Sequence, residues 1–262
     1  MLKNTQIMAI MNLTPDSFYA KSRLFSIQEV VDKAGVFMEE GAEIIDIGGQ
    51  STRPGASMIS EEEEIQRVNP AIEAISKAFP NVLISIDTFQ SKVAEAAIAV
   101  GAKLVNDISC GSFDPNILEV VSKYNATYIG MHITGTKETM HEVPKRSNII
   151  QDLIQFFTQK KLVFAQKGIH HWIIDPGFGF GKTIEENFII IKELQQLKSL
   201  ELPILVGVSR KSSIYKTLGI SPEEALNGTT VVQTMALKNG ASILRVHDVK
   251  EAKQAIKLME LL

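Results

Sequence analysis

The chain has 262 residues, of which 45% are hydrophobic and 22% charged, and its formal net charge at pH 7 is −3. Such a composition and length are typical of one soluble domain that spans residues 1–262, although two small domains would also fit this length. The slightly negative charge excludes a global basic field for nucleic acid, and no apolar run approaches the length of a membrane span. The only cysteine, Cys110, excludes an intrachain disulfide and favours a cytoplasmic location.

Eight short apolar runs follow one another along the chain, and most of them are rich in Ile and Val. They show little alternation of polar and apolar residues, which is typical of parallel strands buried on both faces. We therefore expect eight strands, at Ile7–Met11, Ile44–Ile47, Val82–Ile86, Lys103–Val105, Thr127–Met131, Trp172–Ile174, Ile204–Val208 and Ser242–Val246.

Apolar residues recur at helical spacing between these runs, for example from Ile27 to Met38 and from Ile65 to Phe79. Pro70 lies within the second stripe and predicts a kink or a shifted helix start. Capping-box patterns predict four helix starts, and a glycine before alanine predicts three helix ends. The starts are Ser26, Ser60, Thr183 and Ser221, and the ends are Gly41, Gly101 and Gly240.

This alternation of strand and helix, repeated about eight times without a linker, predicts an α/β protein with a single (β/α)8 TIM barrel. In such barrels the active site lies at the carboxyl ends of the strands. The irregular segments 14–26 and 48–60 follow the first two strands. We expect them to be mobile loops on that face.

The most informative motif is Asp175-Pro-Gly-Phe-Gly-Phe-Gly-Lys182, which joins the sixth strand to a helix. It places a carboxylate at a strand end, with glycines that let the backbone approach a ligand closely. A Walker phosphate loop is excluded because its first glycine would fall at Pro176. The dinucleotide-binding pattern is excluded because its third glycine would be Lys182. A plain connecting turn would not require the bulky Phe178 and Phe180.

Polar residues also close other predicted strands. Asp87, Asn106 and Asp175 would together offer carboxylates and an amide in one pocket, which suits a flat heterocycle with ring N–H, amino and carbonyl groups. Each could instead be a helix N-cap. Three together at strand ends of a barrel favour a binding site.

Basic residues lie at Arg53, at Arg210-Lys211 and at Arg245, with His247 on the same side of the last strand. Loops seven and eight of such barrels often bind phosphate, and a helix amino terminus strengthens that preference. A solvated surface charge is the favoured interpretation for Arg210 alone. Asn12, at the end of the first strand, could bind Mg²⁺ beside phosphate oxygens.

These motifs together resemble the dihydropteroate synthase family of pterin-binding enzymes. The matching segments keep the family's order and cover nearly the whole chain. They are Met11–Phe18, Ile45–Gly55, Ser85–Thr88, Asn106–Ile108, Met131-His132, Asp175–Lys182, Gly207–Ser212 and Arg245–Val249.

The resemblance implies a transferase of folate biosynthesis that condenses 6-hydroxymethyl-7,8-dihydropterin pyrophosphate with p-aminobenzoate, releasing pyrophosphate. It implies a pterin site of Asp87, Asn106, Asp175 and Lys211, with Ile108, Met131 and Gly207 among the substrate-binding residues. Arg245, His247 and Asn12 with Mg²⁺ would bind pyrophosphate, and Thr52 and Arg53 would close over the site. Phe178, Lys211 and Ser212 would border the p-aminobenzoate pocket, where sulfonamides would compete. The catalytic set would be Asp87, Asp175, Lys211 and Arg53. A homodimer is also implied.

The sequence departs from the family after Phe18, where Tyr19-Ala-Lys-Ser-Arg23 replaces the usual Ser-Asp-Gly-Gly. Gln50 stands where Glu is usual. Three alternatives stay open. A pterin-dependent methyltransferase would not need Arg53, Lys211 and Arg245, and a phosphosugar lyase would want a Schiff-base lysine on a strand. A non-catalytic pterin-binding homologue would fit only the altered first loop.

Overall fold

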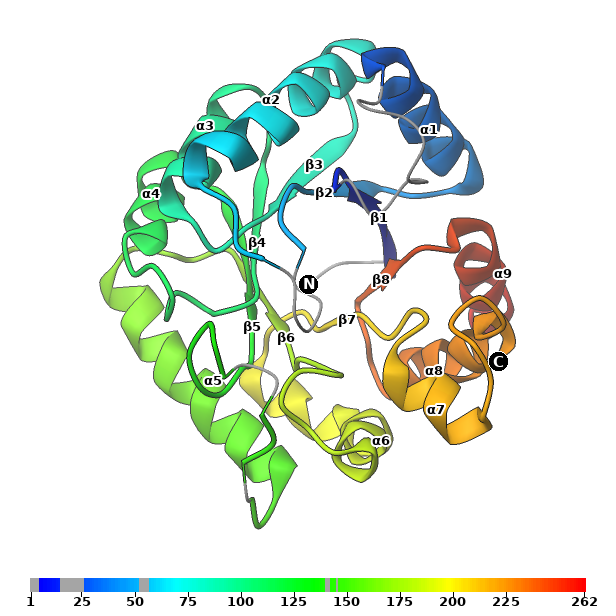
Figure 1. The fold of residues 1–262 in the computed structure, drawn as a ribbon. Coiled ribbons are helices and arrows are strands. Elements are labelled where there is room, and N and C mark those ends of the chain that lie inside the picture. The colour runs from blue at the N-terminus through cyan, green and yellow to red at the C-terminus, as the bar shows by residue number, and fades with distance from the viewer. Residues whose placement is uncertain (1–4, 15–25, 52–56, 140–141, 145) are drawn as a thin grey trace.

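Eight parallel strands form one sheet that curves into a nearly closed barrel in the computed structural model, which describes residues 5–14, 26–51, 57–139, 142–144 and 146–262 (Figure 1). The strand order is β6-β5-β4-β3-β2-β1-β8-β7, and a single bridge between Ile174 and Ile204 joins the two edges. The predicted TIM barrel is therefore confirmed. The strands are β1 Gln6–Asn12, β2 Ile44–Gly48, β3 Leu83–Asp87, β4 Leu104–Asp107, β5 Thr127–Met131, β6 Trp172–Asp175, β7 Leu205–Val206 and β8 Ile243–Val246.

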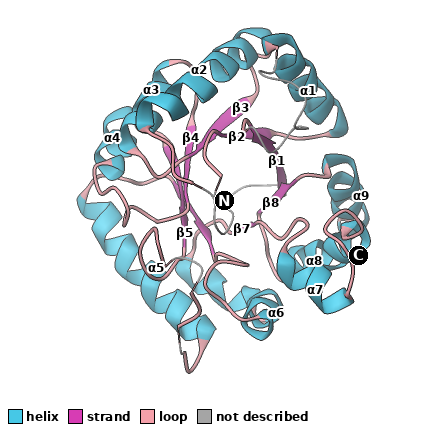
Figure 2. Cartoon of the chain, viewed as in Figure 1, coloured by secondary structure: helices cyan, strands magenta, loops and turns pink. Residues whose placement is uncertain are grey.

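The helices form a ring around this sheet, and the strands lie inside it (Figure 2). A short helix, α7, lies between β7 and α8 in addition to the helix expected for each strand. The helices are α1 Ile27–Glu40, α2 Glu61–Ala78, α3 Ser91–Ala99, α4 Ile117–Tyr124, α5 Ile149–Gln166, α6 Ile184–Lys192, the 3₁₀ helix Leu194–Leu200, α7 Ser212–Leu218, α8 Leu226–Lys238 and α9 Val249–Met259.

Two hydrophobic clusters account for the uniformly apolar strands. One face of each strand packs against the surrounding helices in the large outer core. The other face of every strand except β3 contributes to a small cluster inside the barrel. Its members are Met8, Ile44, Leu104, Ile129, Ile173, Leu205 and Ile243. Because side chains alternate along a strand, the residues two positions further on lie on the same inner face, nearer the carboxyl ends.

Most predicted helix boundaries agree with the structure. Ser26 and Thr183 form reciprocal capping boxes, whereas Ser60 accepts a hydrogen bond from the Glu63 N–H at 3.1 Å without the reciprocal bond. Gly41, Gly101 and Gly240 all adopt positive φ values at helix ends, as expected.

One predicted helix start is wrong. Ser221 does not begin a helix, because a bend at Pro222 and a turn at residues 223–225 follow it and α8 starts at Leu226. The Ser221 N–H donates to the Glu224 carboxylate at 3.0 Å, but the Ser221 side chain does not cap α8. Pro70 lies inside α2 and does not shift its start, which is set by Ser60 and four glutamates in the first turn. The predicted kink at Pro70 stays a prediction.

Candidate active site

A polar layer lies directly above the inner apolar cluster, at the carboxyl ends of the strands. Its positions follow from the two-residue repeat, because Ile44, Leu104 and Ile173 point inward and Asp46, Asn106 and Asp175 come two residues later. The same step leads from Ile243 to Arg245. Register pairs Asp87 of β3 with Asn106 of β4. The fold therefore gathers residues that are far apart in sequence into one site.

Arg245 is the centre of this layer. Its Nε donates to Asp46 Oδ2 at 2.6 Å, and one Nη donates to Asp87 Oδ2 at 2.7 Å. The Asn106 amide donates to the same Asp46 oxygen at 2.9 Å. Asp46 is fully buried, and its other oxygen has no hydrogen-bond partner among the described residues. Asp46 thus fixes both the guanidinium and the amide.

Burial makes two carboxylates of this layer, Asp87 and Asp175, weaker acids than an ordinary aspartate. It raises the pKa of Asp87 to about 7, and the positive charge of Arg245 opposes that rise. Burial also raises the pKa of Asp175, against the opposing effects of Lys211 and of the Gly177 N–H, which donates to Asp175 at 2.7 Å. Perturbed carboxylates of this kind mark candidate functional sites.

Lys211 lies at the start of α7, immediately before Ser212, and faces the loop after β6. Its Nζ donates to the Phe178 carbonyl oxygen and lies 4.5 Å from the centre of the Phe180 ring. Burial lowers the pKa of Lys211 to about 8, although Asp175 opposes the shift. The predicted proximity of Asp175, Phe178, Lys211 and Ser212 is consistent with this arrangement.

His247 follows β8, and its Nδ1 lies 2.9 Å from Ser209 Oγ, so the loops after β7 and β8 meet here. Arg210 does not join the site. It forms an ion pair with Asp248 at 2.8 Å and donates to the carbonyl oxygens of Pro222 and Glu223. The sequence predicted a solvated surface charge for Arg210, whereas its side chain is 26% exposed and is held by these contacts outside the polar layer.

An apolar wall borders the polar layer. Ile108 and Met131 pack with Phe89 and Ile133, and the ring of Phe180 packs against this cluster. A Cβ at Gly207 would lie 3.7 Å from Cβ and 3.9 Å from Cδ of Arg245, so Gly207 lies beside the aliphatic part of that side chain.

Asn12 ends β1 next to Gly48. A Cβ at Gly48 would meet Asn12 Oδ1 at 3.4 Å and Asp87 Oδ2 at 3.7 Å, so these two oxygens flank one glycine. Among the described residues no cluster of three His, Cys, Asp or Glu side chains could hold a metal. The oxygen donors present suit Mg²⁺ only if substrate phosphates and water supply the remaining ligands.

Thr52, Arg53 and the Tyr19–Arg23 segment lie outside the described residues. Gln50 lies two residues before Thr52. It donates its amide N–H groups to the carbonyl oxygens of Ser51 and Ser57, and its amide oxygen accepts from the Ile59 N–H. A glutamate could not make the two donations, so Gln50 replaces a charge with a cross-link between both sides of this loop.

Sequence reasoning assigned no role to three residues in or beside the site. Asp46 ends an apolar run of the sequence, and it shares the inner face with Ile44, a spacing that could have placed it in the polar layer. Lys182 was used only to exclude a dinucleotide loop, and its burial is a tertiary property. Phe180, which covers Lys211, was not included among the site residues.

The comparisons with known proteins agree with this geometry. Residues 8–247 match the family model described as "Pterin binding enzyme". The dihydropteroate synthase of Escherichia coli is 40% identical over 261 residues, which cover 99% of this chain and 92% of that protein.

Solved structures agree as well. A Yersinia pestis dihydropteroate synthase in complex with a sulfonamide drug superposes with a TM-score of 0.93 at 36% identity, covering 100% of this chain and 95% of that one. The Xanthomonas albilineans enzyme in complex with 7,8-dihydropteroate has a TM-score of 0.89 at 31% identity, covering 100% and 94%. The chain therefore belongs to the pterin-binding enzyme family, among the dihydropteroate synthases.

Proposed function

We propose that this chain condenses 6-hydroxymethyl-7,8-dihydropterin pyrophosphate with p-aminobenzoate to give 7,8-dihydropteroate and pyrophosphate in folate biosynthesis. The observation that carries the proposal is the layer of buried carboxylates, an amide and two cations at the carboxyl ends of the barrel. Family membership and the product complex of the Xanthomonas relative support the same reaction.

Asp87, Asn106, Asp175 and Lys211 would bind the pterin. The ring presents N–H and amino donors to the carboxylates and a carbonyl acceptor to the amide or ammonium. Ile108 and Met131 offer an apolar surface for its face. A few polar groups that converge beside an apolar wall are typical of small-molecule pockets.

Arg245 and His247 would bind the pyrophosphate, with Arg53 and Thr52 closing over it. Two of the five N–H groups of Arg245 bond Asp46 and Asp87, which leaves donors for phosphate oxygens. Asn12, beside Asp87, would hold Mg²⁺ together with those oxygens. The bound ion would help to neutralise the leaving group.

Phe178, Lys211 and Ser212 would border the p-aminobenzoate pocket. The Yersinia relative in complex with a sulfonamide drug supports competition by such compounds at this pocket. We expect sulfonamides to raise the apparent KM for p-aminobenzoate without changing the maximal rate.

The reaction would proceed by S_N1-like displacement. Departure of pyrophosphate leaves a cation at the pterin methylene, which the ring delocalises and Asp87 and Asp175 stabilise electrostatically. The arylamine nitrogen then attacks the methylene and releases a proton. No enzyme nucleophile is required. Kinetic isotope effects at the methylene carbon that indicate concerted attack would contradict this order of events.

The three alternatives are not favoured. The cations Lys211 and Arg245 suit a pyrophosphate leaving group rather than methyl transfer. Among the described strands, none carries an inward lysine for a Schiff base. Intact polar residues in the layer favour catalysis over binding alone. We also propose a cytoplasmic homodimer of a single domain. No described helix is long and apolar enough to cross a membrane.

A pyrophosphate-release assay with Mg²⁺, pterin pyrophosphate and p-aminobenzoate tests the function. Release should depend on p-aminobenzoate, and Lys211→Ala and Arg245→Ala should each lower kcat/KM by roughly 10²- to 10³-fold because each removes a charge from the site. Lys216→Ala, an exposed lysine on the same helix as Ser212, is the matched control. Pterin binding without any release would contradict the synthase function and favour the non-catalytic homologue.

A further inference from the structure

A buried lysine outside the proposed substrate contacts, Lys182, lies beneath the loop that follows β6. Only 7% of its surface is exposed. Its Nζ donates to the carbonyl oxygens of Gly177 at 2.9 Å, Phe180 at 3.0 Å and His132 at 3.3 Å. An ammonium group has three N–H donors, so all of them are used. Lys182 thereby links the end of β5 to the loop after β6.

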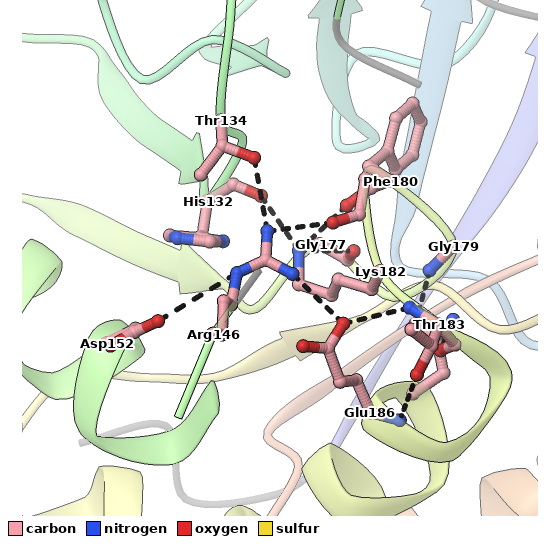
Figure 3. Close-up of polar contacts among 12 residues, drawn as sticks. His132, Thr134, Arg146, Asp152, Gly177, Gly179, Phe180, Lys182, Thr183 and Glu186 are labelled. Atoms are coloured by element: carbon pink, nitrogen blue, oxygen red, sulfur yellow. Dashed lines mark hydrogen bonds and ion pairs between the residues drawn. The ribbon is translucent and has the colours of Figure 1, made fainter. Parts of the chain in front are cut away.

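A second buried cation, Arg146, holds the other end of the same loop (Figure 3). Its side chain is 4% exposed and donates to the Gly181 carbonyl oxygen at 2.7 Å and to Thr134 Oγ1 at 3.1 Å. It also forms an ion pair with Glu186 at 2.9 Å, and that carboxylate accepts the Thr183 N–H at the start of α6. We name Lys182 and Arg146, with the carbonyl oxygens that they bind, the cation clamp.

The loop has little backbone hydrogen bonding of its own. Among the described residues one such bond lies within it, from the Phe180 N–H to the Gly177 carbonyl oxygen at 3.1 Å. Gly177, Gly179 and Gly181 all have positive φ, at 71°, 85° and 55°, and the segment belongs to neither β6 nor α6. A Cβ at Gly177 would lie 2.2 Å from the His132 carbonyl oxygen, so the loop packs tightly against β5. Buried carbonyl groups left without donors would cost about 1–3 kcal/mol each.

Burying a neutral side chain at position 182 would carry a smaller desolvation penalty than burying the charged lysine. Burial lowers the pKa of Lys182 to about 7, and the charge of Arg146 acts in the same direction. Among the described residues no carboxylate forms an ion pair with Lys182, so carbonyl oxygens are its only acceptors. The three N–H donors of Lys182 therefore explain the use of a lysine here, and pairing with a carboxylate does not.

The loop held by the cation clamp also contacts Lys211. The carbonyl groups of Gly177 and Phe180 face Lys182, whereas the carbonyl group between them, that of Phe178, accepts from Lys211 Nζ. A Cβ at Gly179 would lie 2.9 Å from Lys211 Cδ. Because the two lysines bind neighbouring carbonyl groups of one tight turn, we expect a movement of the turn to displace Lys211.

We propose that Lys182 and Arg146 are positioning residues that hold the Gly177–Gly181 turn so that Lys211 is placed for substrate. The proposal rests on the proposed function, since it assigns Lys211 to the substrate site. The clamp acts through Lys211 and touches no reacting atom.

The binding of 7,8-dihydropteroate, measured by isothermal titration calorimetry, tests the proposal without requiring turnover. Lys182→Met keeps the length and apolar stem but removes the three donors, and we expect its Kd to rise roughly 10- to 100-fold. Lys192→Met is the matched control, because Lys192 ends α6 and its side chain is 80% exposed. Wild-type affinity in a folded Lys182→Met variant would overturn the proposal.

A double-mutant cycle with Lys211→Met separates positioning from general destabilisation. If Lys182 acts through Lys211, adding Lys182→Met to Lys211→Met should weaken binding no further. Additive losses would overturn the proposal, because they would show that Lys182 affects binding by an independent route. Circular dichroism and thermal melting establish that each variant is folded.

If Lys182→Met does not fold, the variant Arg146→Lys tests the proposal by the same binding measurement. This variant retains a positive charge but loses the guanidinium geometry that reaches Gly181, Thr134 and Glu186 together. We expect a smaller rise in Kd that disappears in the Lys211→Met background, and a rise that persists there would overturn the proposal. Failure of the wild-type protein to bind 7,8-dihydropteroate would instead overturn the proposed function and the clamp's role with it.

Discussion

At the scale of single residues, Asp46 organises the site although it was not expected to be part of it. One of its oxygens accepts from both Arg245 and Asn106 in a fully buried setting. A shared carboxylate of this kind couples the group proposed for pyrophosphate to the group proposed for pterin. The geometry of both therefore depends on one side chain that the substrates need not touch.

Asp46→Asn should lower the free energy of unfolding by about 1–3 kcal/mol, because a buried guanidinium loses one of its two charged partners. Urea denaturation measures this change. Asp32→Asn is the matched control, since Asp32 is exposed on α1 and accepts a hydrogen bond from Gln28 at 2.8 Å, and it should change stability by less than about 0.5 kcal/mol. Equal stability of the two variants would contradict the role of Asp46.

The pKa shifts in the layer predict a narrow pH optimum. Asp87 keeps its proton until about pH 7, and only its ionised form can stabilise the pterin cation. Lys211 loses its proton above about pH 8, and only its charged form attracts an anionic substrate. The kcat/KM for pterin pyrophosphate should therefore be highest between these values and fall on both sides. In Asp87→Asn the fall on the acidic side should shrink, and an unchanged acidic side would count against Asp87.

At the scale of elements, local sequence signals predicted strands and helix ends well where all the interacting groups lie close together in the sequence. Capping boxes at Ser26 and Thr183 formed because both partners lie within one turn of the helix that they begin. The same pattern at Ser221 failed. The chain turns between Pro222 and Ala225 before α8 begins, and α7, packed beside α8, occupies this part of the barrel.

This difference predicts different costs for the same kind of substitution. Ser26→Ala and Thr183→Ala should each lower the free energy of unfolding by about 1 kcal/mol because each removes an N-cap acceptor. Ser221→Ala should change it by less than about 0.5 kcal/mol, as expected for an exposed position without that role. Chemical denaturation of the three variants provides the comparison. A loss at Ser221 as large as at Thr183 would contradict the turn seen before α8.

At the scale of the whole molecule, the barrel has one weak seam. The strand β7 has only two paired residues, and a single bridge at Ile174 and Ile204 joins it to β6. The strands β1 and β2, in contrast, pair over five residues. The loops after β6 and β7, which carry Phe178 and Lys211, border this seam. The bond from Lys211 Nζ to the Phe178 carbonyl oxygen joins these two loops across the seam, whereas the cation clamp lies on the β5–β6 side of it.

Native-state hydrogen exchange should locate this seam. Amides of Leu205 and Val206 should exchange through openings of lower free energy than those of Ile45 and Ile47, because fewer ladder hydrogen bonds protect them. Mass spectrometry of peptides covering β7 and β2 measures the difference. The prediction fails if both strands are equally protected.

The sequence by itself determined the eight strands, the alternation with helices and the barrel, because these follow from local periodicity and from the burial of parallel strands on both faces. It also identified Asp87, Asn106, Asp175, Lys211 and Arg245, since polar groups at strand ends of a barrel converge on one face. Only the tertiary structure decided which of these side chains contact each other. The sharing of Asp46 and the clamp of Lys182 and Arg146 join residues between 2 and 199 positions apart, and burial lowered the pKa of Lys182. Neither distance nor desolvation is encoded in a local pattern.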